Sequence, residues 1–186
     1  MKKLFSIMVT FVLLAMVSGC TTIYKTAVDE RSVGQIASDT KIKASIVNSF
    51  REDDTMKALD FFVGVYYGEV YLVGAYKSIA QRDRAIKIAK ETENVHGVST
   101  YILPAKKDHP CTTKVNLAIT GKVMGRLIKD TDVWSTNIDV KTVQCNVVLV
   151  GLVGSTTEVN KAIAHAKSVE GVRKVKSFLK TSKEKE

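Results

Sequence analysis

The sequence predicts an α+β protein made of two tandem units, each with the element order helix-strand-strand-helix-strand. Three observations support this fold class: an internal repeat, a change between four-residue and two-residue spacing of apolar positions within each copy, and the placement of both prolines in one short stretch between the copies. A sheet covered on one face by helices is a stable layered arrangement. We therefore expect each unit to pack two helices on one face of a three-stranded mixed sheet.

The repeat is clearest around the second helix of each copy. The stretch VYLVGAYKSIAQRDRAIKIAK (residues 70–90) aligns without a gap with VVLVGLVGSTTEVNKAIAHAK (residues 147–167). In both stretches an apolar run ends at a glycine, and a capping box follows with Ser78 or Ser155 at its start. This match predicts a strand and then a helix at the same place in each unit.

The outer parts of the copies match less closely, and we align them with gaps. Thr40-Lys41-Ile42 corresponds to Thr113-Lys114-Val115 as the opening of each first helix, which gives the second copy four extra residues before its first strand. Gly97 corresponds to Gly171, which gives the first copy three extra residues. The predicted organisation is a first domain at residues 32–103, a linker at 104–110, a second domain at 111–180 and a charged tail at 181–186.

The spacing of apolar residues predicts the elements within each copy. Ile42, Ile46 and Phe50 recur every four residues, as on one face of a helix. The stretch DFFVGVYYGEVYLVG then contains two β-rich runs around a Tyr-Gly pair, which predicts a hairpin. A second helix and a last strand complete the unit. Because strand-helix-strand crossovers are right-handed, we expect the last two strands to be parallel.

The N-terminus carries a secretory signal that ends at a cysteine. Two lysines precede a run of fourteen residues, Leu4 to Val17, which is almost wholly apolar and too short to span a membrane comfortably as a helix. The sequence Val17-Ser18-Gly19-Cys20 resembles the bacterial lipobox, which implies acylation of Cys20 by fatty acids such as palmitate. Thr21, in place of Asp, favours the outer membrane. The predicted segments are a signal peptide at residues 1–19 and a tether at residues 20–31; an ordinary secreted protein is the alternative.

Two copies of this element order behind a lipobox resemble the BON domain family. The resemblance rests on the Thr-Lys-Ile/Val triplets, the glycine that ends each hairpin, the serine-capped helices and the Gly-Val pair before each last strand. It covers nearly all of the chain after the signal. It implies binding to phospholipid membranes and a role in envelope integrity, with no enzymatic activity.

Charge is divided unevenly between the two copies. Residues 20–104 contain 11 Lys and Arg against 11 Asp and Glu, whereas residues 105–186 contain 15 against 8. A partner with a negative surface should therefore meet the second unit. An exported protein does not meet nucleic acid, so we expect an anionic phospholipid membrane as the partner.

Two cysteines, Cys111 and Cys145, remain after the signal. Outside the cytoplasm two thiols tend to oxidise, so a disulfide is the default expectation. The alternatives are buried free thiols and a metal site with His109 or His165, although the spacing typical of metal ligands is missing. Cys145 also aligns with Gly68 in the hairpin turn, where cysteine is a poor choice. This departure from the BON pattern favours the bridge and leaves the geometry of the second turn open.

The sequence offers few groups that could converge for catalysis. The three histidines, His96, His109 and His165, lie before a strand, in the linker and on a helix, without a carboxylate or nucleophile at a typical spacing. There is no nucleophile elbow and no phosphate-binding loop. We therefore predict a protein that is not an enzyme, with no catalytic residues, no metal, no cofactor and no small-molecule substrate.

The candidate lipid-binding residues belong to the first helix of the second unit and the loop after it: Lys114, Lys122, Arg126, Lys129 and Trp134. The helical spacing puts the four cations loosely on one side, and tryptophan suits the headgroup level of a bilayer. Further cations extend the basic surface: Lys161, Lys167, Arg173, Lys174 and Lys176. The alternative is a solvated basic face with Trp134 packed partly under its loop.

Two further features point to other contacts. Gly121 and Gly125 share a helix face, which allows close approach by a backbone or a headgroup, or simply a bent helix. In the first unit, several tyrosines surround the hairpin, and strand alternation leaves some of them exposed for an envelope protein: Tyr66, Tyr67, Tyr71 and Tyr76. A periplasmic adaptor that acts through such protein contacts is the alternative to lipid recognition.

Overall fold

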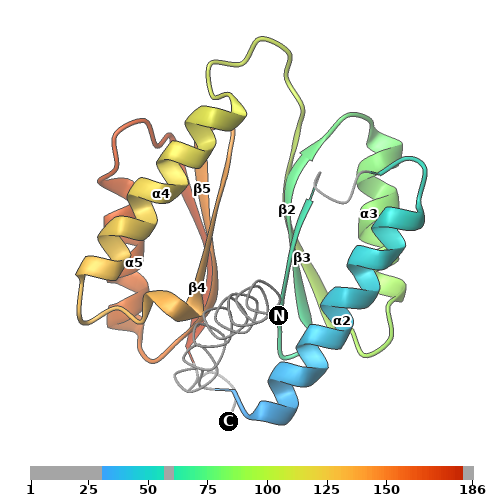
Figure 1. The fold of residues 1–186 in the computed structure, drawn as a ribbon, viewed down its shortest axis with the longest axis horizontal. Coiled ribbons are helices and arrows are strands. Elements are labelled where there is room, and N and C mark those ends of the chain that lie inside the picture. Colours follow the sequence, from blue (N-terminus) through green and yellow to red (C-terminus); the bar gives the residue numbers. More distant parts are fainter. Residues whose placement is uncertain (1–30, 57–60, 182–186) are drawn as a thin grey trace, which may run out of the picture.

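The computed structural model describes residues 31–56 and 61–181, so the predicted signal peptide, Cys20 and residues 182–186 lie outside the described residues. The first unit consists of α2 (Val33–Glu52), β1 (Phe61–Tyr66), β2 (Glu69–Tyr76), α3 (Ile79–Glu91) and β3 (Gly97–Pro104). The second unit consists of α4 (Thr113–Lys129), a short 3-10 helix η1 (Ser135–Asn137), β4 (Ile138–Val143), β5 (Asn146–Val153), α5 (Thr156–Lys167) and β6 (Lys174–Thr181). Figure 1 shows the two units side by side.

Each unit is built on a mixed three-stranded sheet. β1 is antiparallel to β2 and β2 is parallel to β3, and the second unit repeats this pattern with β4, β5 and β6. The helices after the hairpins begin at the predicted caps, because Ser78 Oγ accepts from the Gln81 amide at 3.1 Å and Ser155 Oγ from the Glu158 amide at 3.2 Å. The predicted α+β fold, with tandem helix-strand-strand-helix-strand units, is confirmed.

The two units match without any gap, so the gapped alignment of their outer parts is wrong. The strands begin at 61 and 138, 69 and 146, and 97 and 174, a constant separation of 77 residues. Thr40 lies inside α2 and donates to the Ile36 carbonyl at 2.7 Å, whereas Thr113 is the first residue of α4. Gly97 starts β3 at the place that Lys174, not Gly171, holds in β6. The linker between the units also begins one residue later than the predicted residue 104, because Pro104 is the last residue of β3.

The core-facing positions explain why the ungapped register is the physical one. Ile42, Ile46 and Phe50 are buried on α2, and the residues 77 positions later, Ile119, Val123 and Leu127, are buried on α4. Each set packs against the helix-facing side of its own sheet. A slip of four residues would keep a helix face roughly in place, which is why the Thr-Lys triplets align plausibly while being one turn out of register.

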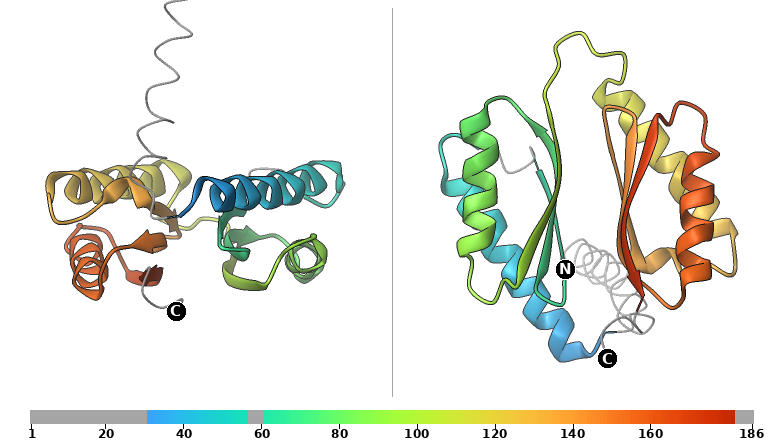
Figure 2. Two further views of the ribbon diagram at one scale, coloured as in Figure 1. Left: turned by 90° about the horizontal axis from the view of Figure 1, so that it is seen from below. Right: turned by 180° about the vertical axis from the view of Figure 1, so that it is seen from behind.

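The other faces of the two sheets pack against each other. Tyr71 and Val73 of β2 form one apolar cluster with Val148 and Val150 of β5, and Figure 2 shows the two sheets face to face between the outer helices. β1 contacts β5 and β2 contacts β4, which are equivalent pairs in the two units. The repeats therefore associate as a pseudo-twofold pair within one chain.

This interface changes the prediction for the tyrosines of the first unit. Tyr71 is only 2% exposed, and its ring lies 5.4 Å from that of Phe178 in β6. The hydroxyl of Tyr66 donates to Asp139 in β4 at 2.9 Å. The predicted exposure of these two tyrosines toward an envelope partner is therefore wrong, because they contact the second unit instead.

A side chain of the first helix holds the hairpin turn in each unit. Asp39, buried on α2, accepts from the amides of Tyr67 and Gly68, both at 2.9 Å. Its counterpart Asn116 accepts from the Cys145 amide, also at 2.9 Å. A polar side chain at this helix position thus satisfies turn amides that would otherwise be buried without a partner.

The second turn keeps the geometry of the first although cysteine replaces glycine. Tyr67 and Gly68 have φ of 54° and 74°, and Gln144 and Cys145 have φ of 50° and 61°. Cys145 forms a disulfide with Cys111, with their Cα atoms 5.5 Å apart, and lies just beyond the N-terminal end of α4 in space. The bridge fixes a residue whose left-handed backbone is otherwise unfavourable for a side chain.

A close backbone approach at Gly151 gives a stability prediction. A Cβ atom at Gly151 would lie 2.1 Å from the carbonyl oxygen of Asn137, a backbone atom that cannot move aside. Gly151→Ala should therefore lower the free energy of unfolding by about 1–3 kcal/mol, measured by urea unfolding. The matched control is Gly121→Ala, where no atom lies within 4 Å of the added Cβ; it should raise helix stability by up to about 1 kcal/mol. Equal effects of both variants would contradict the steric argument.

Candidate membrane-binding face

Helix α4 presents an apolar stripe to solvent on the side away from its core-facing residues. Leu117, Met124 and Ile128 are 67%, 43% and 66% exposed. Their spacing of seven and four residues places them within about 40° of one another around the helix. Gly121 lies on the same stripe, and apart from its chain neighbours and the surrounding helix backbone no atom lies within 4 Å of where its Cβ would be. The glycine therefore flattens the stripe, and no other described part of the chain packs against it.

The four predicted cations lie together beside this stripe. Lys114, Lys122, Arg126 and Lys129 are all exposed. Measured around the helix from Leu117, they occupy the sector from about 60° to 180°, between the apolar stripe and the buried side. Arg126 is held by a hydrogen bond from its Nη1 to Ser168 Oγ at 2.6 Å, which fixes one cation of the row. We call the stripe, these cations and Trp134 the α4 face.

Trp134 lies in the loop after α4 and is 53% exposed. Its backbone amide donates to the Glu158 carboxylate at 2.7 Å, and the Gly154 amide donates to the other oxygen at 2.9 Å. Glu158 is only 4% exposed, so a buried carboxylate from α5 anchors the loop. Val133, next to the tryptophan, is buried in the core. The backbone is therefore fixed while the indole faces outward.

A second set of contacts ties the end of α4 to α5. Asp130, the C-cap of α4, contacts His165 Nε2 at 2.7 Å and Lys161 Nζ at 3.5 Å. The hydrogen bond from His165, followed by that from the Asp132 amide, lowers the pKa of Asp130. Lys161 also pairs with Asp132. The predicted extension of the basic surface through Lys161 is therefore wrong, because two carboxylates neutralise it.

A small apolar pocket of about 230 Å³ opens next to the stripe. It is lined by Met124, Leu127 and Ile128 from α4, and by Ser135 and Thr136 from η1. Two hydroxyl-bearing residues thus meet three apolar side chains at the end of the α4 face. The pocket is continuous with the stripe because Met124 and Ile128 belong to both.

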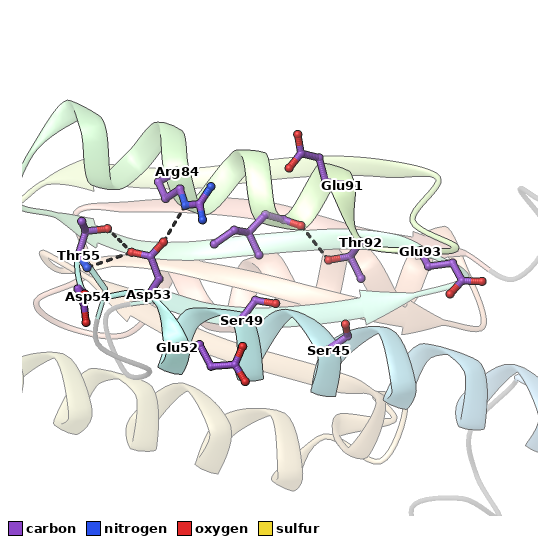
Figure 3. Close-up of a pocket in the computed structure, with 11 residues that line it drawn as sticks. Ser45, Ser49, Glu52, Asp53, Asp54, Thr55, Arg84, Glu91, Thr92 and Glu93 are labelled. Carbon is purple, nitrogen blue, oxygen red and sulfur yellow. Dashed lines mark hydrogen bonds and ion pairs between the residues drawn. The ribbon is translucent and has the colours of Figure 1, made fainter.

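The equivalent surface of the first unit has the opposite charge. Lys122, Arg126 and Lys129 correspond, at the 77-residue separation, to Ser45, Ser49 and Glu52. In Figure 3 these residues line a cleft of about 680 Å³ between α2 and α3, together with several carboxylates: Asp53, Asp54, Glu91 and Glu93. The apolar stripe is also missing there, since Leu117 and Ile128 correspond to Thr40 and Arg51.

The acidic cleft has internal ion pairing. Arg84 Nε donates to Asp53 at 2.7 Å, and the Thr55 amide donates to the same carboxylate at 3.0 Å. The Arg84 hydrogen bond, followed by those from Thr55, lowers the pKa of Asp53 to about 2. Within residues 31–56 and 61–181, no group of three His, Cys, Asp or Glu side chains could hold a metal ion. The cleft therefore presents negative charge without a metal-ligand cluster.

Three of the remaining predicted cations do not join the α4 face, whereas exposed Lys167 of α5 directly precedes Ser168, the hydrogen-bond partner of Arg126. Lys174 and Lys176 lie on β6, and Arg173 contacts His109 Nε2 at 3.1 Å through its Nη1. The apolar residues of the stripe are not recognisable as a separate face in the sequence, because their spacing of seven and four residues overlaps with the spacing of the core residues on the same helix. The sequence of α4 nevertheless contains more apolar residues than one buried face needs, and this excess is the signal that could have identified the stripe.

The sequence of the chain matches a known family twice. A family model described as the BON domain matches residues 38–103 and again residues 116–183. The chain belongs to the BON domain family. The predicted resemblance and the predicted repeat are thus confirmed, and both BON domains contain a complete hairpin, the following helix and the last strand.

Two curated relatives extend over both BON domains. Osmotically-inducible protein Y of Escherichia coli K12 is 32% identical over 80% of this chain and 75% of its own length. Outer membrane lipoprotein DolP of Haemophilus influenzae is 26% identical over 87% of this chain and 83% of its own length. Among solved structures, the C-terminal domain of CdsD, a structural protein of the type III secretion system of Chlamydia trachomatis, shows 12% identity and a TM-score of 0.30, covering 76% of this chain and 65% of that chain.

In the described part of this BON protein, no helix combines the length and the apolar character needed to cross a membrane.

Proposed function

We propose that this BON protein is a non-catalytic envelope lipoprotein, anchored through acylated Cys20, whose second BON domain binds anionic phospholipid at the periplasmic face of the outer membrane. In this role it supports the integrity of that membrane. The observation that carries the proposal is the α4 face, where exposed Leu117, Met124 and Ile128 lie beside four exposed cations and Trp134. Apolar residues that enter the interface next to lysines are the pattern of helices that lie on a bilayer.

The contrast between the two domains supports a division of labour. The first BON domain has serines and a glutamate where the second has its cations, and an acidic cleft beside them. An anionic bilayer would repel that surface and attract the α4 face. One relative supports this location, since it is named an outer membrane lipoprotein.

Trp134 is the only tryptophan and provides a direct test. We expect the unacylated mature chain (residues 20–186 with Cys20→Ser) to sediment with vesicles containing about 20% phosphatidylglycerol or cardiolipin, with a blue shift of the Trp134 emission. Pure phosphatidylcholine should neither bind the chain nor shift its emission. Because the contact is partly electrostatic, binding should fall between low and physiological salt. Equal binding to neutral vesicles, or no binding at either salt, would contradict the proposal.

A further inference from the structure

Among the described residues, the outer edge of the first sheet differs from that of the second in a way that membrane binding does not explain. β3 is the edge strand of the order β1-β2-β3, and β6 is the edge strand of the order β4-β5-β6. β3 (GVSTYILP) contains no charged residue, whereas β6 (KVKSFLKT) contains three lysines. In β3, the residues equivalent to the three lysines of β6 are Gly97, Ser99 and Leu103.

Lysines on an edge strand prevent another chain from pairing with its unpaired backbone groups. Lys174, Lys176 and Lys180 are all exposed, so β6 is protected in this way. β3 has the same backbone, the same parallel pairing with its neighbour and the same length of eight residues, without the protection. Because the two domains share a fold, this difference is a property of the sequence at the edge and not of the architecture.

The other edge of the first sheet is already partly occupied. Arg31 Nη1 donates to the Val65 carbonyl of β1 at 3.2 Å, and its guanidinium lies 4.6 Å from the centre of the Tyr66 ring. In β3, the Gln144 amide group donates to the carbonyl of Pro104, at the last residue of the strand. The stretch from Val98 to Leu103 in β3 is therefore a longer site for pairing with another strand than the partly occupied edge at β1.

The position of β3 decides what kind of chain can reach it. α2 packs on β1 and α3 packs on β3, and the second domain repeats this with α4 on β4 and α5 on β6. In Figure 2, α2 and α4 lie along one side of the molecule and α3 and α5 along the opposite side. If α4 faces the bilayer, as the proposed function requires, then β3 is directed away from it toward the periplasm.

We propose that β3 binds an extended, uncharged segment of another polypeptide as a fourth strand of the first sheet. Backbone hydrogen bonds would supply affinity, and alternate side chains would meet Val98 and Ile102 on the helix side of the sheet and Tyr101 on the other. A second copy on the same membrane does not fit this edge. Antiparallel pairing of two identical strands needs a twofold axis perpendicular to the sheet, which would turn one of the two α4 faces away from the bilayer.

The test uses the unacylated mature chain and a fluorescein-labelled eight-residue peptide of alternating threonine and valine on a soluble Gly-Ser linker. We expect saturable binding by fluorescence anisotropy, and slower amide exchange at Val98–Leu103 when the peptide is bound. Ser99→Lys, which copies Lys176, should weaken binding at least tenfold. The matched control, Lys176→Ser on the other edge, should retain at least the affinity of the unmodified chain.

Three results would overturn the proposal. One is unchanged binding by Ser99→Lys, and another is equal binding of a peptide N-methylated at alternate residues, which cannot form the strand hydrogen bonds. The third is a dimer of the chain that Ser99→Lys dissociates, since a second copy would then occupy the edge. Ser99 belongs to β3, on which α3 packs, and α3 lies on the side of the molecule opposite α4 in Figure 2. Ser99→Lys should therefore bind phosphatidylglycerol vesicles like the unmodified chain. Failure of strand pairing and failure of membrane binding are therefore separate results.

Discussion

Replacing Lys122, Arg126 and Lys129 with serine should reduce the affinity for vesicles containing about 20% phosphatidylglycerol by about 100-fold at low salt. Each cation near an anionic surface contributes about 1 kcal/mol, and these three are exposed along one side of α4. Serine is also what the first BON domain has at two of the three equivalent positions, Ser45 and Ser49. The measurement is vesicle co-sedimentation of the unacylated mature chain over a range of lipid concentrations.

The control removes the same charge from the other domain. Lys41, Lys43 and Arg51 are exposed on α2, and their replacement with serine should change the vesicle affinity by less than about threefold, because they are not beside an apolar stripe. If the two triple variants lost affinity equally, net charge alone would govern binding and the α4 face would have no special role. Circular dichroism of both variants would show that the helices remain folded.

The salt dependence of the two variants separates charge from apolar contact. The variant without Lys122, Arg126 and Lys129 keeps the apolar stripe and Lys114, so its residual binding should be weak and should depend much less on salt. The unmodified chain should instead lose affinity steeply as the Debye length falls from about 10 Å at 0.1 M salt toward about 3 Å at 1 M. Steep salt dependence in this variant would show that other cations govern binding, either Lys114 of α4 or Lys174 and Lys176 of β6.

The element order could be predicted because apolar residues recur at one spacing in the helices and at another in the strands. Ile42, Ile46 and Phe50 predict the buried face of α2, and the serine caps predict where α3 and α5 begin. The alignment of the first helices failed because a shift of four residues changes the direction of a side chain on a helix by only about 40°. Asp39 and Asn116 were the decisive markers, but their shared role at the hairpin turn is visible only in three dimensions.

The candidate site was predicted in part. The cations and Trp134 could be identified by charge and residue type alone, whereas Leu117 and Ile128 were hidden because apolar residues on a helix are first assigned to its core. The packing of the sheets on each other could not be predicted either. Strand alternation shows that Tyr71 faces away from its own helices, but not that Phe178 of the other domain covers it. The alternation of residues along a strand shows which side chains share a face of the sheet. What packs against that face depends on the rest of the chain.

Removing the disulfide should be the most destabilising change in the second BON domain. In the chain-entropy account, a bridge across the 34-residue separation of Cys111 and Cys145 stabilises the folded state by about 4 kcal/mol. The variant with both cysteines replaced by serine should lose about that amount in the free energy of unfolding. Urea unfolding followed by the Trp134 emission would report it, because the tryptophan belongs to the same domain.

A second double variant separates the cross-link from the strain in the turn. Residue 145 has a φ of 61°, which glycine adopts at little cost. Cys111→Ser with Cys145→Gly should therefore be more stable than the double serine variant by about 0.5–1 kcal/mol, while still far less stable than the bridged chain. If the two double variants unfolded at the same urea concentration, the turn would store no strain. If neither lost more than about 1 kcal/mol, the hydrogen bond from the Cys145 amide to Asn116 and the core around it would hold the hairpin without the bridge.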